Sequence, residues 1–182
     1  MDIFHEYIVT KKKELKDYLI TLLLIGAAIV LTFVFAMLTM MYSQYLSSIG
    51  LLLIVGVWWG AVYLIKARNV EFEYILTNNE IDIDKIAARR ARKRMCTINL
   101  KEIELCASIN DARFKHEYEN AGDRSIKNYA GDITGERVYF IDFTMEAERT
   151  RVIFQPGDRM LSAMARVNPR LVHVKDGDVT VL

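Results

Sequence analysis

The sequence predicts an α+β membrane protein: a two-helix transmembrane hairpin, then an antiparallel β-sheet or small barrel that is capped by a C-terminal helix. Three observations predict this fold class. The 48 positions from 18 to 65 contain no Lys, Arg, Asp, Glu or His. After Lys66, apolar and polar residues alternate over several short segments, as they do in half-buried strands. One amphipathic helical pattern, at about 158–168, follows these segments.

The average composition conceals this division of the chain. The 182 residues are 26% charged and 52% hydrophobic with a net charge of +1, which are the values of an ordinary soluble domain. Because every Lys, Arg, Asp, Glu and His lies outside the apolar block, a soluble single domain is excluded. Nine glycines and two prolines exclude a collagen-like chain, and two cysteines exclude a disulfide scaffold. With 20 basic and 19 acidic residues after the block, we expect no nucleic-acid partner.

The apolar block divides at a short polar stretch into two segments, about 18–42 and 46–65. Each segment is long enough to cross a hydrocarbon core about 30 Å thick. The first is longer than the roughly 7–15 apolar residues of a signal peptide, and no small-residue cleavage site follows it. The block therefore predicts a transmembrane hairpin over residues 18–65.

Charges at the ends of the two segments predict their orientation. Four lysines precede the first segment, Lys66 and Arg68 follow the second, and the loop between the segments has no charge. Because cytoplasmic flanks carry the excess of basic residues, we expect a multi-pass protein of the plasma membrane with both termini in the cytoplasm. Neither segment holds a carboxylate, a histidine or an arginine, so a transporter or pump acting alone is not expected.

Two glycines of the second segment, Gly56 and Gly60, form a G-x-x-x-G pattern. Small residues at this spacing let another helix approach closely. That helix belongs to the first segment of the same hairpin, to a second copy in a homodimer, or to a membrane-protein partner.

The first 17 residues form an amphipathic segment that we expect on the cytoplasmic side. Ile3, Phe4, Tyr7 and Ile8 recur at helical spacing ahead of the lysines. This spacing predicts a short helix that lies on the inner leaflet or against the soluble domain.

The cytoplasmic part opens with a predicted strand pair, Val70–Thr77 and 80–86, joined at residues 78–79. Both turn residues are asparagine, which tolerates the positive φ that a two-residue turn demands. With this turn Glu73 faces Asp84, so one face of the pair is apolar and the other is acidic.

The later elements are predicted in the same way. A turn of helix is expected around 112–118, and the late helix is expected to have Asp158 as its N-cap and to stop at Asn168-Pro169. The other expected strands cover residues 94–100, 102–106, 125–129, 137–145 and 149–154, and a final hairpin joins 171–174 to 179–182.

The order of these elements resembles that of bacterial pleckstrin-homology-like (PH-like) domains. The strand pair EYILTNNEIDI, the basic run entering the third strand and the helix after VIFQPGD carry the resemblance, over residues 70 to about 170. With two transmembrane helices in front, the whole chain is similar to a family of uncharacterised small membrane proteins from Gram-positive bacteria. The resemblance implies a PH-like domain over residues 66–182 and supplies no catalytic residue.

The candidate binding site is a basic run at 88–94, which places five positive charges within six positions: Arg89, Arg90, Arg92, Lys93 and Arg94. If the first strand leads away from the membrane and the second runs back, the basic run lies near the membrane surface. There each cation contributes about 1 kcal/mol of binding free energy near anionic lipid head groups. The alternative is structural, because a strand beginning in this run can pair with the acidic face of the first two strands.

No pattern for catalysis, metal binding or cofactor binding occurs in the sequence, and Cys96 and Cys106 form no C-x-x-C pair. We therefore expect a chain that is not an enzyme and that holds no cofactor and no metal. The expected function is a membrane-anchored docking module that contacts anionic inner-leaflet lipid or a protein partner. The alternative is an accessory or regulatory subunit of a membrane enzyme or transporter.

Overall fold

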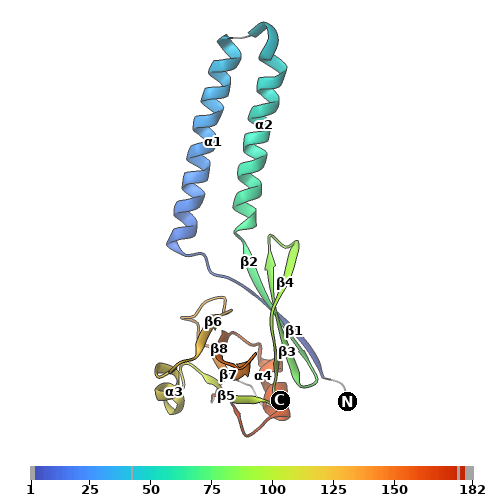
Figure 1. Ribbon diagram of the computed structural model, residues 1–182, viewed down its shortest axis with the longest axis vertical. Coiled ribbons are helices and arrows are strands. Elements are labelled where there is room, and N and C mark those ends of the chain that lie inside the picture. The colour runs from blue at the N-terminus through green and yellow to red at the C-terminus, as the bar shows by residue number, and fades with distance from the viewer. Residues whose placement is uncertain (1–2, 42, 176, 179–182) are drawn as a thin grey trace. The chain divides into compact units, whose positions relative to one another are not determined.

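The computed structural model describes residues 3–41, 43–175 and 177–178, and the chain divides into two compact units (Figure 1). We call the unit from Lys13 to Asn69 the helical unit. The rest of the described chain, which lies before and after it in sequence, is the β unit. Each unit has its own packing and is described by itself.

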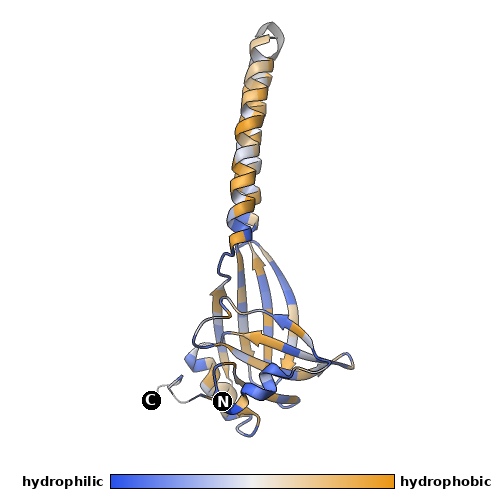
Figure 2. Cartoon of the chain, turned by 90° about the vertical axis from the view of Figure 1, so that its left-hand side faces the viewer, coloured by the Kyte–Doolittle hydropathy of each residue, from blue (hydrophilic) through white to orange (hydrophobic). Residues whose placement is uncertain are grey.

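The helical unit consists of α1 (Leu15–Met41) and α2 (Ser43–Ala67). Both helices are long and apolar enough to span a membrane, and Figure 2 shows apolar colouring over most of their length. They extend beyond the expected spans, since α1 begins at Leu15 and α2 ends at Ala67. Tyr42, the last residue of the first expected span, lies outside the described residues.

The two helices pack together through small residues. Ala28 of α1 and Ala61 of α2 are almost completely buried. Gly50 lies so close to α1 that a Cβ atom there would collide with the side chain of Thr39. At the other end of the pair, Arg68 and Asp17 form an ion pair. The helical hairpin is therefore stabilised by close packing of the two backbones. Such packing is common in membranes, because lipid gives no hydrophobic driving force for helices to associate.

The β unit has two sheets. The first has the strand order β1-β2-β3-β4, and the second has the order β6-β8-β7-β5-β9. The elements of this unit are β1 (Phe4–Thr10), β2 (Val70–Thr77), β3 (Glu80–Ala87), β4 (Ala91–Asn99), β5 (Ile103–Ser108), the 3-10 helix η1 (Ala112–Phe114), α3 (Lys115–Glu119), β6 (Ser125–Asn128), β7 (Tyr139–Met145), β8 (Glu148–Phe154), α4 (Asp158–Val167) and β9 (Val172–His173).

One apolar core joins both sheets to α4. Tyr74 and Ile83 of the first sheet, Ile141 of the second, and Met160 and Met164 of α4 belong to the same buried cluster. Burial of this size is the main favourable contribution to folding, because each large apolar side chain contributes about 1.5–3 kcal/mol. The predicted fold class, α+β with two long apolar helices before a sheet that a late helix covers, is confirmed.

The predicted pairing of β2 with β3 is confirmed residue by residue. Tyr74 pairs with Ile83 and Glu73 pairs with Asp84, and Asn78 at the turn has a φ of 55°. The side-chain alternation then determines that the apolar residues of both strands face the core.

The prediction of a helix near the N-terminus is wrong. Residues Phe4–Thr10 form β1, which pairs antiparallel with nearly the whole length of β2, from Phe4 opposite Thr77 to Thr10 opposite Glu71. The apolar residues of this run follow the helical spacing, but the open edge of β2 determines the structure because it offers hydrogen-bond partners for the backbone of β1.

Two smaller predictions at the C-terminal end also need correction. The N-cap of α4 is Gly157, and Asp158 is the first helical residue. Val172 and His173 form β9, which runs parallel to β5 and adds a fifth strand to the second sheet. Residues 179–182, the expected second arm of a final hairpin, lie outside the described residues.

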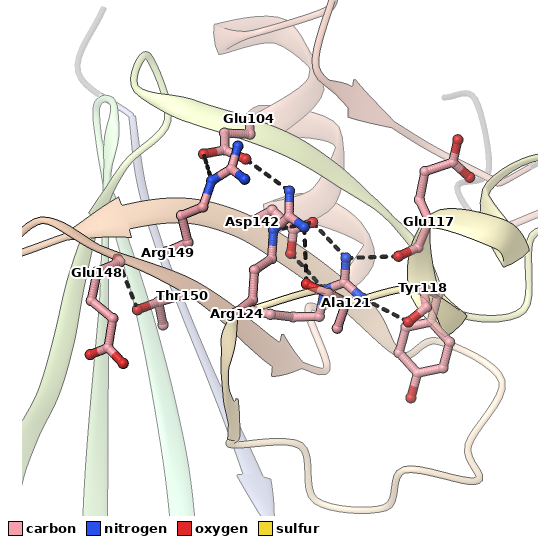
Figure 3. A network of polar contacts seen from close by, with 10 residues as sticks. Glu104, Glu117, Tyr118, Ala121, Arg124, Asp142, Glu148, Arg149 and Thr150 are labelled. Carbon is pink, nitrogen blue, oxygen red and sulfur yellow. Dashed lines mark hydrogen bonds and ion pairs between the residues drawn. The ribbon is translucent and has the colours of Figure 1, made fainter.

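A buried ion-pair network stabilises the second sheet on the side that α3 covers (Figure 3). Arg151 donates two hydrogen bonds of 2.6 Å to the carboxylate of Asp142 and reaches the backbone carbonyls of Glu117 and Tyr118 at 2.9 and 2.7 Å. Its guanidinium also lies 4.5 Å from the ring centroid of Phe140. The network therefore ties the segment between β5 and β6 to the sheet.

Candidate functional site: the basic hairpin

The basic run predicted from the sequence forms the turn between β3 and β4 and the first half of β4. The turn is closed by a hydrogen bond of 3.1 Å from the backbone N–H of Arg90 to the carbonyl of Ala87. Ala88 and Arg89 have φ values of 54° and 57°. For residues other than glycine this conformation costs roughly 1–2 kcal/mol each. The hairpin therefore has a strained tip that carries positive charge.

Three arginines of the run pair with the acidic face. Arg92 lies 2.9 and 2.7 Å from the two carboxylate oxygens of Glu73. Arg94 lies 2.9 Å from Asp84 and 2.7 Å from Asp82, and Arg89 lies 3.2 Å from Glu71. The structural alternative, in which the basic run pairs with the acidic face of the first two strands, therefore explains the positions of these three arginines.

The acidic partners are much more deeply buried than the arginines that cover them. The side chain of Glu73 is 1% exposed, whereas that of Arg92 is 55% exposed. Burial, together with a hydrogen bond to Glu6 of β1, raises the pKa of Glu73 above its usual value, while the charge of Arg92 opposes this shift. The arginines thus act as a partly solvated cover over buried carboxylates.

Arg90 and Lys93 are the two cations of the run that the acidic face does not use. Both are exposed, and neither forms an ion pair with another residue of the described chain. Sequence reasoning missed a further cation, Lys85 of β3, which pairs directly with Lys93 across the hairpin. The sequence feature that could have revealed it is the alternation of β3, which places Lys85 on the opposite face from Asp82 and Asp84.

The hairpin turn lies at the end of the first sheet where both connections to the helical unit begin. Thr10, the last residue of β1, pairs with Glu71. Val70, the first residue of β2, pairs with Ala87, beside the turn. In Figure 1 the turn between β3 and β4 extends past the second sheet.

The predicted helix contact at Gly56 and Gly60 does not involve α1. A Cβ atom at either glycine would have no atom within 4 Å, in contrast to Gly50. The expectation that these glycines pack against the first helix of the same hairpin is therefore wrong. A contact with a second copy or another membrane protein remains a prediction.

The remaining sequence features have a structural explanation. Cys96 and Cys106 are buried free thiols, and burial raises the pKa of Cys96 to about 11, so both are unreactive packing residues near neutral pH. Across the described residues, His, Cys, Asp and Glu side chains form no group of three that would hold a metal ion.

Comparison with known proteins places this architecture in one family. No curated protein and no solved structure matches the chain. A family model described as a bacterial PH-like domain matches residues 1–174, which include both long helices, β1 and the complete basic hairpin. The chain therefore belongs to the bacterial PH-like domain family DUF6106.

Proposed function

We propose that this protein is a non-catalytic docking module, anchored in the cell membrane by α1 and α2, whose PH-like domain faces the cytoplasm and contacts anionic inner-leaflet lipid through the β3–β4 hairpin. The observation that carries this proposal is the position of the exposed cations Arg90 and Lys93 at the end of the sheet where both connections to the helices begin. The chain connection at this end of the sheet is short, since only Arg68 and Asn69 separate α2 from β2.

The charges of the hairpin support a contact of moderate strength. Each Lys or Arg close to an anionic leaflet contributes about 1 kcal/mol. Arg89, Arg92 and Arg94 already have acidic partners, so their contribution is smaller than that of Arg90 and Lys93. For a domain that is already tethered, a contribution of this size is enough to orient it at the surface.

The lipid contact is tested with the full chain in nanodiscs of phosphatidylcholine, alone or mixed with phosphatidylglycerol. Amide hydrogen exchange of the hairpin is the measurement. We expect slower exchange at 87–92 in the anionic discs and loss of this difference in an R90Q/K93Q variant. K101Q/R170Q removes two exposed cations elsewhere in the β unit and should retain the difference. Equal exchange of the wild-type hairpin in both discs would contradict the proposal.

The cytoplasmic orientation is tested separately by fusing a phosphatase that is active only after export to the C-terminus. We expect no phosphatase activity, together with normal activity of a matched fusion placed between α1 and α2. Activity of the C-terminal fusion would overturn the orientation.

The second candidate is an accessory subunit of a membrane enzyme or transporter. The observation that favours it is the face of α2 with Gly56 and Gly60, which α1 leaves uncovered. Purification in mild detergent, followed by mass determination, separates the two candidates. A stoichiometric membrane-protein partner that is lost in a G56L/G60L variant would support this candidate, and a lone monomer or homo-oligomer would remove it.

A further inference from the structure

Two lysines of the hairpin face each other without an acid between them. Lys85 of β3 pairs directly with Lys93 of β4. Neither forms an ion pair with any residue in the described part of the chain, although three arginines of the same hairpin do. Like charges directly opposite each other on neighbouring strands destabilise a sheet. The pair is therefore a local cost that the acidic face does not compensate.

The lysine pair lies on the core-facing side of the first sheet, at the end of the core. Lys85 follows Ile81 and Ile83 in the alternation of β3, and its partner on β2 is Phe72, which is 6% exposed. The ring of Phe72 lies 5.6 Å from that of Tyr129. Beyond this row burial decreases, since Val70, the next residue of β2 on the same face, is only partly buried against the core.

A third lysine reaches the same end of the core from the second sheet. Lys127 of β6 pairs with Val152, a buried core residue of β8, so Lys127 lies on the core-facing side as well. It is close enough to Cys96 of β4 for its positive charge to act on that thiol. Lys127 also has no ion pair with a described residue. Three cations from β3, β4 and β6 thus approach one place without a compensating acid.

We propose that Lys85, Lys93 and Lys127 form a binding site for a phosphate group at this end of the core. A phosphate monoester carries about two negative charges on one compact group, so it neutralises more than one ammonium at once, which a carboxylate cannot do. Lysine binds phosphate as a compact point charge with three donors.

This inference deepens the proposed function, because the phosphate can belong to a lipid head group of the inner leaflet or to a soluble phosphate ester. The competing explanation is that the aliphatic stems of the lysines cover Phe72 and keep their ammonium groups in water. Substitution by methionine separates the two, because methionine retains an unbranched apolar side chain and removes the charge.

The test measures the rate at which each lysine of the full chain is acetylated, by mass spectrometry of its peptides, in nanodiscs. One arm adds glycerol 3-phosphate to discs of phosphatidylcholine, and the other uses discs that contain phosphatidic acid. We expect the phosphate ligand to slow the acetylation of Lys85, Lys93 and Lys127 and to leave that of the exposed control Lys101 unchanged. In a K85M/K93M variant, the affinity for the phosphate ligand is read from the protection of Lys127. We expect this affinity to fall about thirtyfold, or about fivefold per lysine removed. The variant K101M/R170M should bind as the wild type does.

The outcomes distinguish the source of the phosphate and the two proposals. Protection only by phosphatidic acid identifies a lipid, and protection by glycerol 3-phosphate identifies a soluble ester. Equal protection of Lys101, or full protection of Lys127 in K85M/K93M, would overturn the phosphate site. If hydrogen exchange shows the hairpin on anionic discs while the lysines stay unprotected, the lipid contact stands and the site fails. A single K127M variant provides the same test should K85M/K93M fail to fold.

Discussion

The guanidinium of Arg151 and the carboxylate of Asp142 form a bidentate pair that is almost completely buried within the second sheet, with side-chain exposures of 1% and 3%. The remaining donors of Arg151 reach the two carbonyls at the end of α3. Arg124 adds a second positive charge 3.4 Å from Asp142. Because each polar group of Arg151 has a partner, the pair connects β7, β8 and the segment that carries α3.

Replacing Arg151 with methionine should destabilise the β unit by about 3–5 kcal/mol, because Asp142 then remains as a buried charge without its main partner. The midpoint of thermal unfolding of the full chain in neutral detergent measures this loss. R149M on the same strand is the control, since Arg149 is 63% exposed and lies 3.8 Å from Glu104. An R151M/D142N double variant should lose less than the sum of the single variants. Strict additivity would show that the two side chains do not interact.

The sequence predicts local pairing well and distant pairing poorly. The register of β2 and β3 follows from a two-residue turn and from alternation, both of which lie within one short segment. The pairing of β1 with β2 depends on a partner about seventy residues away, so no local period reveals it.

The candidate site shows the same limit at the level of single residues. The five cations at 88–94 are visible as a run, and so is the acidic face that three of them contact. The pairing of Lys85 with Lys93 is not visible, because it depends on a register shift at Ile83/Asp84. Such an irregularity changes which side chains are opposite each other and leaves little trace in the composition of a strand. The burial of Arg151 is equally hidden, since arginine is usually exposed.

Stability should fall as the pH rises through the raised pKa of Glu73. Burial and the hydrogen bond to Glu6 favour the protonated carboxyl in the folded state, so the stabilising contribution is fully present below the unfolded pKa of about 4.3 and is lost above the folded pKa. We expect E73Q to show a flatter dependence of the unfolding midpoint on pH than the wild type. E80Q, at an exposed acid of the neighbouring strand β3, should leave the wild-type dependence intact. Identical pH profiles for E73Q and the wild type would contradict this assignment.

The pair of Lys12 with Asp132 should contribute stability that disappears in acid. The two side chains lie 2.8 Å apart, and the hydrogen bond from Lys12, together with two from Thr134, lowers the pKa of Asp132 to about 2. A lowered pKa means that the contribution is present above the unfolded value of about 3.9 and is lost as the pH falls through the folded value. D132N should therefore show faster amide exchange at Lys12 near neutral pH and a smaller loss of stability in acid. D123N, at an exposed acid, is the control, and equal exchange at Lys12 in both variants would count against the pair.

Replacement of glycine by leucine should destabilise the helical unit at one position of α2 and leave its packing unchanged at another. A side chain at Gly50 would collide with Thr39 of α1, whereas one at Gly56 would have no atom within 4 Å. G50L should thus force the helices apart and destabilise the helical unit by about 1–3 kcal/mol, the usual cost of overpacking. G56L should leave the packing of α1 on α2 unchanged, which thermal unfolding of the purified monomer in detergent measures. A loss of stability in G56L monomers would show that α1 does cover this face. If G56L instead leaves the monomer stable and abolishes an assembly that the wild type forms in mild detergent, the glycine face binds a second polypeptide.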